Sequence, residues 1–80
     1  MTRNEVFRIV QDIFVKTFKV DHDTIKDTTS SDNLENWDSL RHVILIISIE
    51  KELKIKIPLG ESMKLKTVDD IVASCMEKVQ

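Results

Sequence analysis

Apolar residues near the N-terminus recur at steps of three and four, and most of the charged residues lie between them. Because an α-helix turns once in about 3.6 residues, this spacing places the apolar side chains on one face. The pattern therefore predicts an amphipathic helix over residues 3–18. Its apolar stripe comprises Val6, Ile9, Val10, Ile13, Phe14 and Phe18.

The helical pattern breaks between Lys19 and Asp38, where Asp, Thr, Ser and Asn residues are concentrated. Their side chains compete with helical backbone hydrogen bonds, so we expect a long loop. Loops of about 20 residues are uncommon in compact domains and are usually functional or held by their own contacts. Ile25, Leu34 and Trp37 are the expected contacts. A calcium loop is disfavoured, because an apolar residue and a lysine stand where a ligand and the turn glycine are needed.

A second helix is predicted from Ser39 to about Lys54, with Asp38 as its N-cap. Angular placement at about 100° per residue divides its apolar residues between two faces. One face holds His42, Leu45, Ile46, Ile49 and Leu53, and the other holds Leu40, Val43, Ile44 and Ile47. One face suffices for the core. On the other face, the loop could cover Val43 and Ile47, whereas Leu40 and Ile44 are the better candidates for an exposed contact patch.

The C-terminal third begins with Pro58 and Gly60, which are expected to end the regular structure of the second helix. A short helical turn is expected over residues 61–65. Thr67 then resembles an N-cap, and a last helix follows with an apolar stripe. That stripe comprises Val68, Ile71, Val72, Cys75, Met76 and Val79. The predicted fold is all-α: one domain over residues 1–80, a small four-helix bundle of three longer helices and one short helical turn, with a long loop between the first two helices.

The composition of the chain disfavours several classes of function. The 80 residues include 12 basic and 14 acidic side chains, so the formal charge of −2 lacks the positive field that nucleic-acid binding needs. No apolar run is long enough to cross a membrane, and Glu5 and Asp12 stand where a secretory signal would be basic and then apolar. The single cysteine, Cys75, agrees with a reducing, cytoplasmic location and is expected to act as a small apolar residue. Chains this short are more often binding or carrying modules than catalysts.

Ser39 stands between an acidic residue and an apolar helix, a position that allows three interpretations. A hydrolytic nucleophile could use His42 one turn away, but the G-x-S-x-G elbow and a glycine for an oxyanion hole are lacking. Asp38 and Ser39 could simply cap the helix. An attached phosphodiester is the third interpretation, because the positive end of a helix favours an anion by about 0.3–1 kcal/mol.

Four segments, "WDSLRHV", "ILIISIEKEL", "IKIP" and "TVDDIVASCMEKV", together resemble the acyl carrier protein family in their order along the chain. The resemblance implies that Ser39 receives 4′-phosphopantetheine from coenzyme A through a separate Mg²⁺-dependent transferase. It also implies that the arm carries an acyl or aminoacyl group as a thioester. The protein would then be a monomeric carrier without catalytic activity or a bound metal, and it would serve loading and transfer enzymes.

The same resemblance assigns roles to the neighbours of the serine. Asp38 would cap the helix and help to present the hydroxyl. The residues expected to face the transferase and partner enzymes are Leu40, Val43, Ile44 and Ile47, together with Arg41, for which a solvated surface charge is the simpler interpretation.

Two features separate this chain from the carriers of bulk fatty acid synthesis, whose second helix is strongly acidic. Here Arg41 and His42 follow the serine, and Lys51, Lys54 and Lys56 offset Glu50 and Glu52. Trp37 also replaces a more usual small residue. Charge complementarity controls encounter rates, so a balanced helix is poorly steered to a basic partner. We therefore expect a specialised pathway. The alternative is a small helical protein-interaction domain without a prosthetic group; a DNA-binding helix-turn-helix is disfavoured by the long loop.

Overall fold

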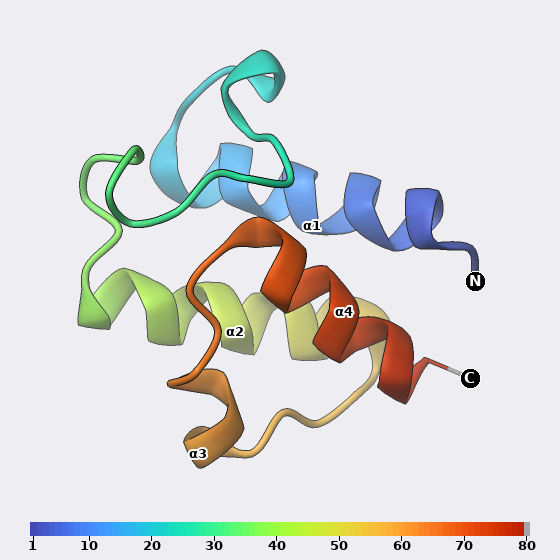
Figure 1. Cartoon of the computed structure of the whole chain (residues 1–80). Helices are drawn as coiled ribbons and strands as arrows, with labels where there is room; N and C mark the ends of the chain where they lie inside the picture. The colour runs from blue at the N-terminus through green and yellow to red at the C-terminus, as the bar shows by residue number, and fades with distance from the viewer. Residues whose placement is uncertain (80) are drawn as a thin grey trace.

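The structure is a computed structural model that describes residues 1–79, and the regular elements within that range are all helices (Figure 1). The elements are α1 (Arg3–Phe18), a 3₁₀ turn η1 (His22–Thr24), α2 (Ser39–Leu53), α3 (Leu59–Ser62) and α4 (Val68–Lys78). Helix α1 packs against both α2 and α4. The predicted order of three longer helices, one short helix and one long loop is therefore confirmed.

Side chains at their N-termini explain where α1 and α4 begin. The hydroxyl of Thr2 accepts the N–H of Glu5, and the Glu5 carboxylate accepts the N–H of Thr2. Thr67 and Asp70 form the same reciprocal pair at α4, as the position of Thr67 predicted. Such capping boxes satisfy N–H groups that the helix itself leaves without partners.

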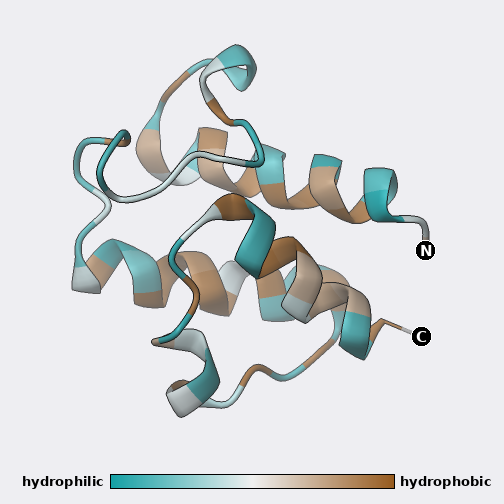
Figure 2. Ribbon diagram, viewed as in Figure 1, coloured by the Kyte–Doolittle hydropathy of each residue, from teal (hydrophilic) through white to brown (hydrophobic). Residues whose placement is uncertain are grey.

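The apolar core lies between the three longer helices, where their apolar faces meet in Figure 2. Each buried aliphatic side chain stabilises the fold by about 1.5–3 kcal/mol, so this core accounts for most of the stability. Its fully buried members include Val6, Val10, Phe14, Leu45, Ile49, Val68, Ile71, Val72 and Cys75.

The long loop is held at several points. Ile25, Leu34 and Trp37 are buried, as predicted. The backbone of the loop also pairs with the start of α4, because the N–H of Val68 donates to the carbonyl oxygen of Thr29 at 2.9 Å. The sequence pattern missed η1, which contains no buried residue. A turn of that kind leaves no apolar spacing in the sequence.

In the segment between α2 and α4, the short helix begins at a different residue than predicted. Helix α2 ends at Leu53, and Lys54 caps it in a left-handed conformation with φ of 56°. Helix α3 begins directly after Pro58, two residues earlier than the turn expected at residues 61–65. Pro58 has φ of −56°, which suits the entrance to a helix, so the proline starts a helix rather than only ending the regular structure.

Candidate functional site

Ser39 is exposed and is the first residue of α2. The Asp38 carboxylate caps the helix, because its Oδ1 accepts the N–H of Arg41 at 2.9 Å. Within residues 1–79, no hydrogen-bond partner is found for the backbone N–H groups of Ser39 and Leu40. Two free donors and the positive end of α2 therefore lie beside the Ser39 hydroxyl, an arrangement that favours an anion.

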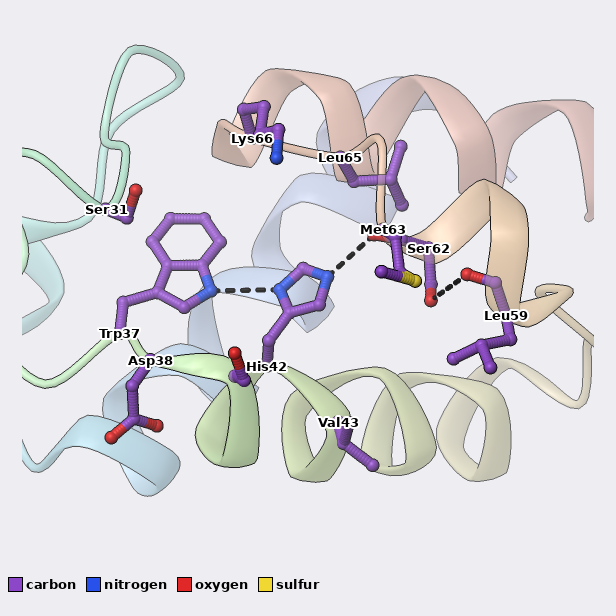
Figure 3. A pocket seen from close by; sticks show the side chains of 11 residues that line it. Ser31, Trp37, Asp38, His42, Val43, Leu59, Ser62, Met63, Leu65 and Lys66 are labelled. Carbon is purple, nitrogen blue, oxygen red and sulfur yellow. Dashed lines mark hydrogen bonds between the residues drawn. The ribbon is translucent and has the colours of Figure 1, made fainter.

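A groove of about 410 Å³ opens beside this serine, between the start of α2, the end of the long loop and α3 (Figure 3). Its lining mixes apolar, aromatic and polar side chains. The lining residues are Ser31, Trp37, Asp38, Ser39, His42, Val43, Leu59, Ser62, Met63, Leu65 and Lys66. A group attached to Ser39 would therefore have a partly apolar surface within reach.

A chain of two hydrogen bonds crosses the inner side of the groove (Figure 3). The indole N–H of Trp37 donates to Nδ1 of His42 at 3.0 Å, and Nε2 of His42 lies 2.7 Å from the carbonyl oxygen of Ser62. Both ring nitrogens of His42 are thus engaged away from Ser39. His42 is not placed to deprotonate Ser39, which removes the base that a hydrolytic mechanism would need.

The second apolar face of α2 is exposed along its length. The exposed fractions are 67% for Leu40, 45% for Val43, 45% for Ile44 and 48% for Ile47. The outer face, as we call these four residues, is an apolar surface with no partner among residues 1–79. Surfaces of this kind commonly mark interaction sites.

The loop does not cover Val43 or Ile47, although the sequence allowed it to. Its aromatic residue turns toward α1 instead: the ring of Trp37 packs edge-on against Phe14, with centroids 5.1 Å apart, and lies 6.2 Å from Phe18. The apolar residues of the loop therefore complete the main core and leave the outer face open.

Arg41 is half exposed, and its side chain lies near Asp38, the N-cap of α2. Its Nη1 is 3.4 Å from Oδ2 of Asp38. Exposed pairs of this kind contribute little to stability, about 0–1 kcal/mol. A contact between Arg41 and a partner enzyme remains a prediction.

Sequence reasoning missed the hydrogen-bonded cluster that ties α3 to α4. Oε2 of Glu61 accepts the ammonium of Lys78 at 2.6 Å and also the hydroxyl of Ser74. These two hydrogen bonds, the one from Lys78 first, lower the pKa of the Glu61 carboxyl below its ordinary value. The three residues are polar and far apart in sequence, so no periodic pattern connects them.

Cys75 lies in the core, as its place in the last apolar stripe predicted. Burial raises the pKa of its thiol to about 11, so the thiol stays protonated at neutral pH. Among residues 1–79 no helix is long and apolar enough to cross a membrane, and no three His, Cys, Asp or Glu side chains are grouped to hold a metal ion.

Comparison with known proteins gives a consistent result. Residues 8–75 match the family model described as the phosphopantetheine attachment site. The acyl carrier protein of Lactobacillus acidophilus is 36% identical over 73 residues, with 91% of each chain covered, and that of Petrotoga mobilis is 38% identical over 80 residues, with 99% of this chain and 93% of the relative covered. The solution structure of the holo acyl carrier protein from Geobacter metallireducens superposes with a TM-score of 0.82 at 36% identity, covering 92% of this chain and 85% of that one.

The helical fold, the groove beside Ser39 and the matches to known proteins together define a carrier domain. The chain belongs to the acyl carrier protein family. It is therefore a non-catalytic carrier whose prosthetic group is 4′-phosphopantetheine, attached by a phosphopantetheinyl transferase. Carriers of this family interact with that transferase and with acyl-handling enzymes.

Proposed function

We propose that Ser39 is the attachment residue and that the arm on it carries an acyl or aminoacyl group as a thioester. The observation that carries the proposal is the exposed hydroxyl on the first residue of α2, beside the free N–H groups of Ser39 and Leu40. A phosphodiester at this position would accept hydrogen bonds from those donors. The groove beside Ser39 offers the arm apolar side chains such as Leu59 and Met63.

The residues present fit this group and its attachment. Asp38 fixes the start of α2, and its carboxylate is already bonded to the Arg41 N–H, so it leaves the hydroxyl of Ser39 accessible. During attachment, Ser39 Oγ would lose its proton and form a bond to the phosphorus that carries the pantetheine in coenzyme A. The pyrophosphate P–O bond would break, and adenosine 3′,5′-bisphosphate would leave. The bound arm would supply the terminal thiol that forms the thioester.

The outer face, with Arg41 at its edge, is the proposed docking surface for the transferase and the acyl-handling enzymes. Its four apolar side chains begin immediately after Ser39, so an enzyme that docks there would be close to the arm. Aromatic and aliphatic anchors at the centre of an interface usually supply most of its binding energy. We propose further that the carrier acts as a single domain and as a monomer in the cytoplasm.

We also assign the carrier to a specialised biosynthetic pathway rather than to bulk fatty acid synthesis. The support is the balanced charge of α2, in which Arg41 and Lys51 offset Glu50 and Glu52. The test is to offer the holo protein to a bulk fatty acid synthase beside that system's own carrier. Elongation at an equal rate would contradict the assignment.

The attachment site is tested by intact mass. The purified protein is incubated with coenzyme A, Mg²⁺ and a promiscuous phosphopantetheinyl transferase, together with two single variants. Wild type and Ser31→Ala, which removes another exposed serine at the groove, should each gain one phosphopantetheine group. Ser39→Ala should gain none. An interaction domain without a prosthetic group would leave all three masses unchanged.

A further inference from the structure

Helix α3 forms one wall of the groove but has no apolar anchor of its own. Ser62 is its only buried residue, whereas Leu59 is 69% exposed and Met63, directly after the helix, is 65% exposed. Ile57 before it and Leu65 after it contact the core. Elements with few buried apolar contacts open most easily, so the position of α3 depends on its polar links.

Two polar links hold α3 to the longer helices. The carboxylate of Glu61 binds Ser74 and Lys78 on α4. On the other side, Nε2 of His42 on α2 lies 2.7 Å from the carbonyl oxygen of Ser62. His42 is thus the residue of α2 that bonds to α3 itself, whereas Glu50 of α2 accepts the N–H of Ile57 just before α3.

The partners of His42 define its proton arrangement. The Trp37 indole N–H can only donate, so Nδ1 must accept; the Ser62 carbonyl can only accept, so Nε2 must carry the proton. These two partners fit the tautomer that has its proton on Nε2. Rotation of the imidazole would break both bonds together, which makes this ring a rigid connection.

The same ring forms the inner wall of the groove next to Ser39. Trp37 precedes the serine by two residues, His42 follows it by three, and their rings stack with centroids 6.0 Å apart at 21°. Behind Trp37 lie the rings of Phe14 and Phe18 in the core. A chain tethered at Ser39 cannot pass inward here without displacing His42 or Trp37.

The geometry points to His42 as a positioning residue: it ties α3 to α2 and closes the inner wall of the groove, so that the carried group stays in the open groove and does not enter the core. The part of this inference that concerns the carried group rests on the proposed attachment at Ser39. The link from α2 through His42 to α3, which we call the tether, does not rest on that attachment. It follows that thioesters of short and long acyl groups are almost equally open to attack from water.

The tether is tested on the protein without its arm by amide hydrogen exchange. His42→Ala removes both bonds and should speed exchange at Met63 and Leu65, whose amides bond within this segment, by about five- to tenfold. Amides in the middle of α1 should not change. His42→Gln can still donate to the Ser62 carbonyl and should restore slow exchange.

A milder variant covers the case in which His42→Ala does not fold. Trp37→Phe keeps an aromatic ring in the core but removes the indole donor, and it should speed the same amides by about twofold. Unchanged exchange in Trp37→Phe and in every folded His42 variant, or exchange in His42→Gln as fast as in His42→Ala, would overturn the tether.

The position of the carried group is tested with acetyl and octanoyl thioesters attacked by hydroxylamine. In the wild type and in His42→Gln the two groups should react at nearly the same rate. In His42→Ala the octanoyl group can reach the opened core, and its thioester should react at least about threefold more slowly than the acetyl thioester. This part would be overturned if the octanoyl thioester of the wild type already reacted much more slowly than the acetyl thioester. Equal rates of the two thioesters in His42→Ala would also overturn it. If Ser39 takes no arm, the proposed attachment fails, while the exchange data still decide the tether.

Discussion

The two apolar faces of α2 have similar side chains and opposite surroundings. The inner face, Leu45, Ile46, Ile49 and Leu53, is buried, whereas the outer face, Leu40, Val43, Ile44 and Ile47, is 45–67% exposed. The difference arises because α1 packs on one side of α2 and the long loop closes over α1 rather than over the outer face. Apolar residues on one helix thus serve folding on one side and, in our proposal, recognition on the other.

The largest difference between the two faces is expected in how much each contributes to the free energy of unfolding. Ile49 is fully buried and Ile47 is 48% exposed, so the same substitution has different costs at positions two residues apart. Ile49→Ala should lower the free energy of unfolding by about 2–5 kcal/mol, because it removes buried contacts and leaves a cavity. Ile47→Ala should change it by about 0.5 kcal/mol or less. Urea denaturation of the two variants measures both values, and equal losses would contradict the division.

The outer face should matter for recognition instead. Ile44→Ala is expected to lower kcat/KM for the phosphopantetheinyl transferase by about tenfold, since an apolar anchor at the centre of an interface is lost. The urea midpoint should stay close to that of the wild type. Glu52→Ala, an exposed change on the same helix, is the control and should leave the transfer rate within about twofold. A normal rate in Ile44→Ala would mean that the transferase docks elsewhere.

The start of α2 links the two faces, and its cap can be tested separately. Asp38→Ala leaves the N–H of Arg41 without its acceptor and should lower the free energy of unfolding by about 1 kcal/mol. Asp38→Asn keeps an oxygen at the capping position and should recover most of that loss. Thermal and urea unfolding of the two variants distinguish the capping hydrogen bond from the negative charge of Asp38. If Asp38→Asn lost as much free energy of unfolding as Asp38→Ala, the charge would dominate.

The smallest effect is expected at the polar link between α3 and α4. The pKa of Glu61 is lower in the folded protein than its ordinary value of 4.5, so the unfolded chain binds the proton more readily. The contribution of this carboxylate is therefore present above about pH 4.5 and is lost as the pH falls through the folded-state pKa. Glu61→Gln should lose less stability than the wild type between pH 7 and pH 3, as judged by urea midpoints. An identical acid dependence in the two proteins would exclude Glu61 as a contributor.

The regular parts of the fold could be predicted because they depend on local rules. The three- and four-residue spacing of apolar side chains defined α1, α2 and α4, and Asp38 and Thr67 marked two helix starts by their capping chemistry. Ser39 was identified as a candidate from its place at a helix start and from family resemblance. Its exposure agrees with that interpretation.

The parts that could not be predicted depend on contacts between distant residues. Whether the loop covers Val43 and Ile47 depends on the direction in which Trp37 turns, and the spacing of apolar residues does not define that direction. The bond between His42 and Ser62 joins residues 20 positions apart. Helix α3 has four residues and one buried side chain, which is too little for a periodic signal, so the sequence predicts its start two residues too late.

The most direct test of the central claim is to locate the prosthetic group within the chain. The protein is produced together with a phosphopantetheinyl transferase, digested, and its peptides are sequenced by tandem mass spectrometry; Ser48→Ala, which removes the other serine of α2, serves as the matched control. We predict one phosphopantetheine group on Ser39 in both the wild type and Ser48→Ala. A group found on any other residue, or an unmodified Ser39 in a protein that the transferase has otherwise modified, would contradict the account.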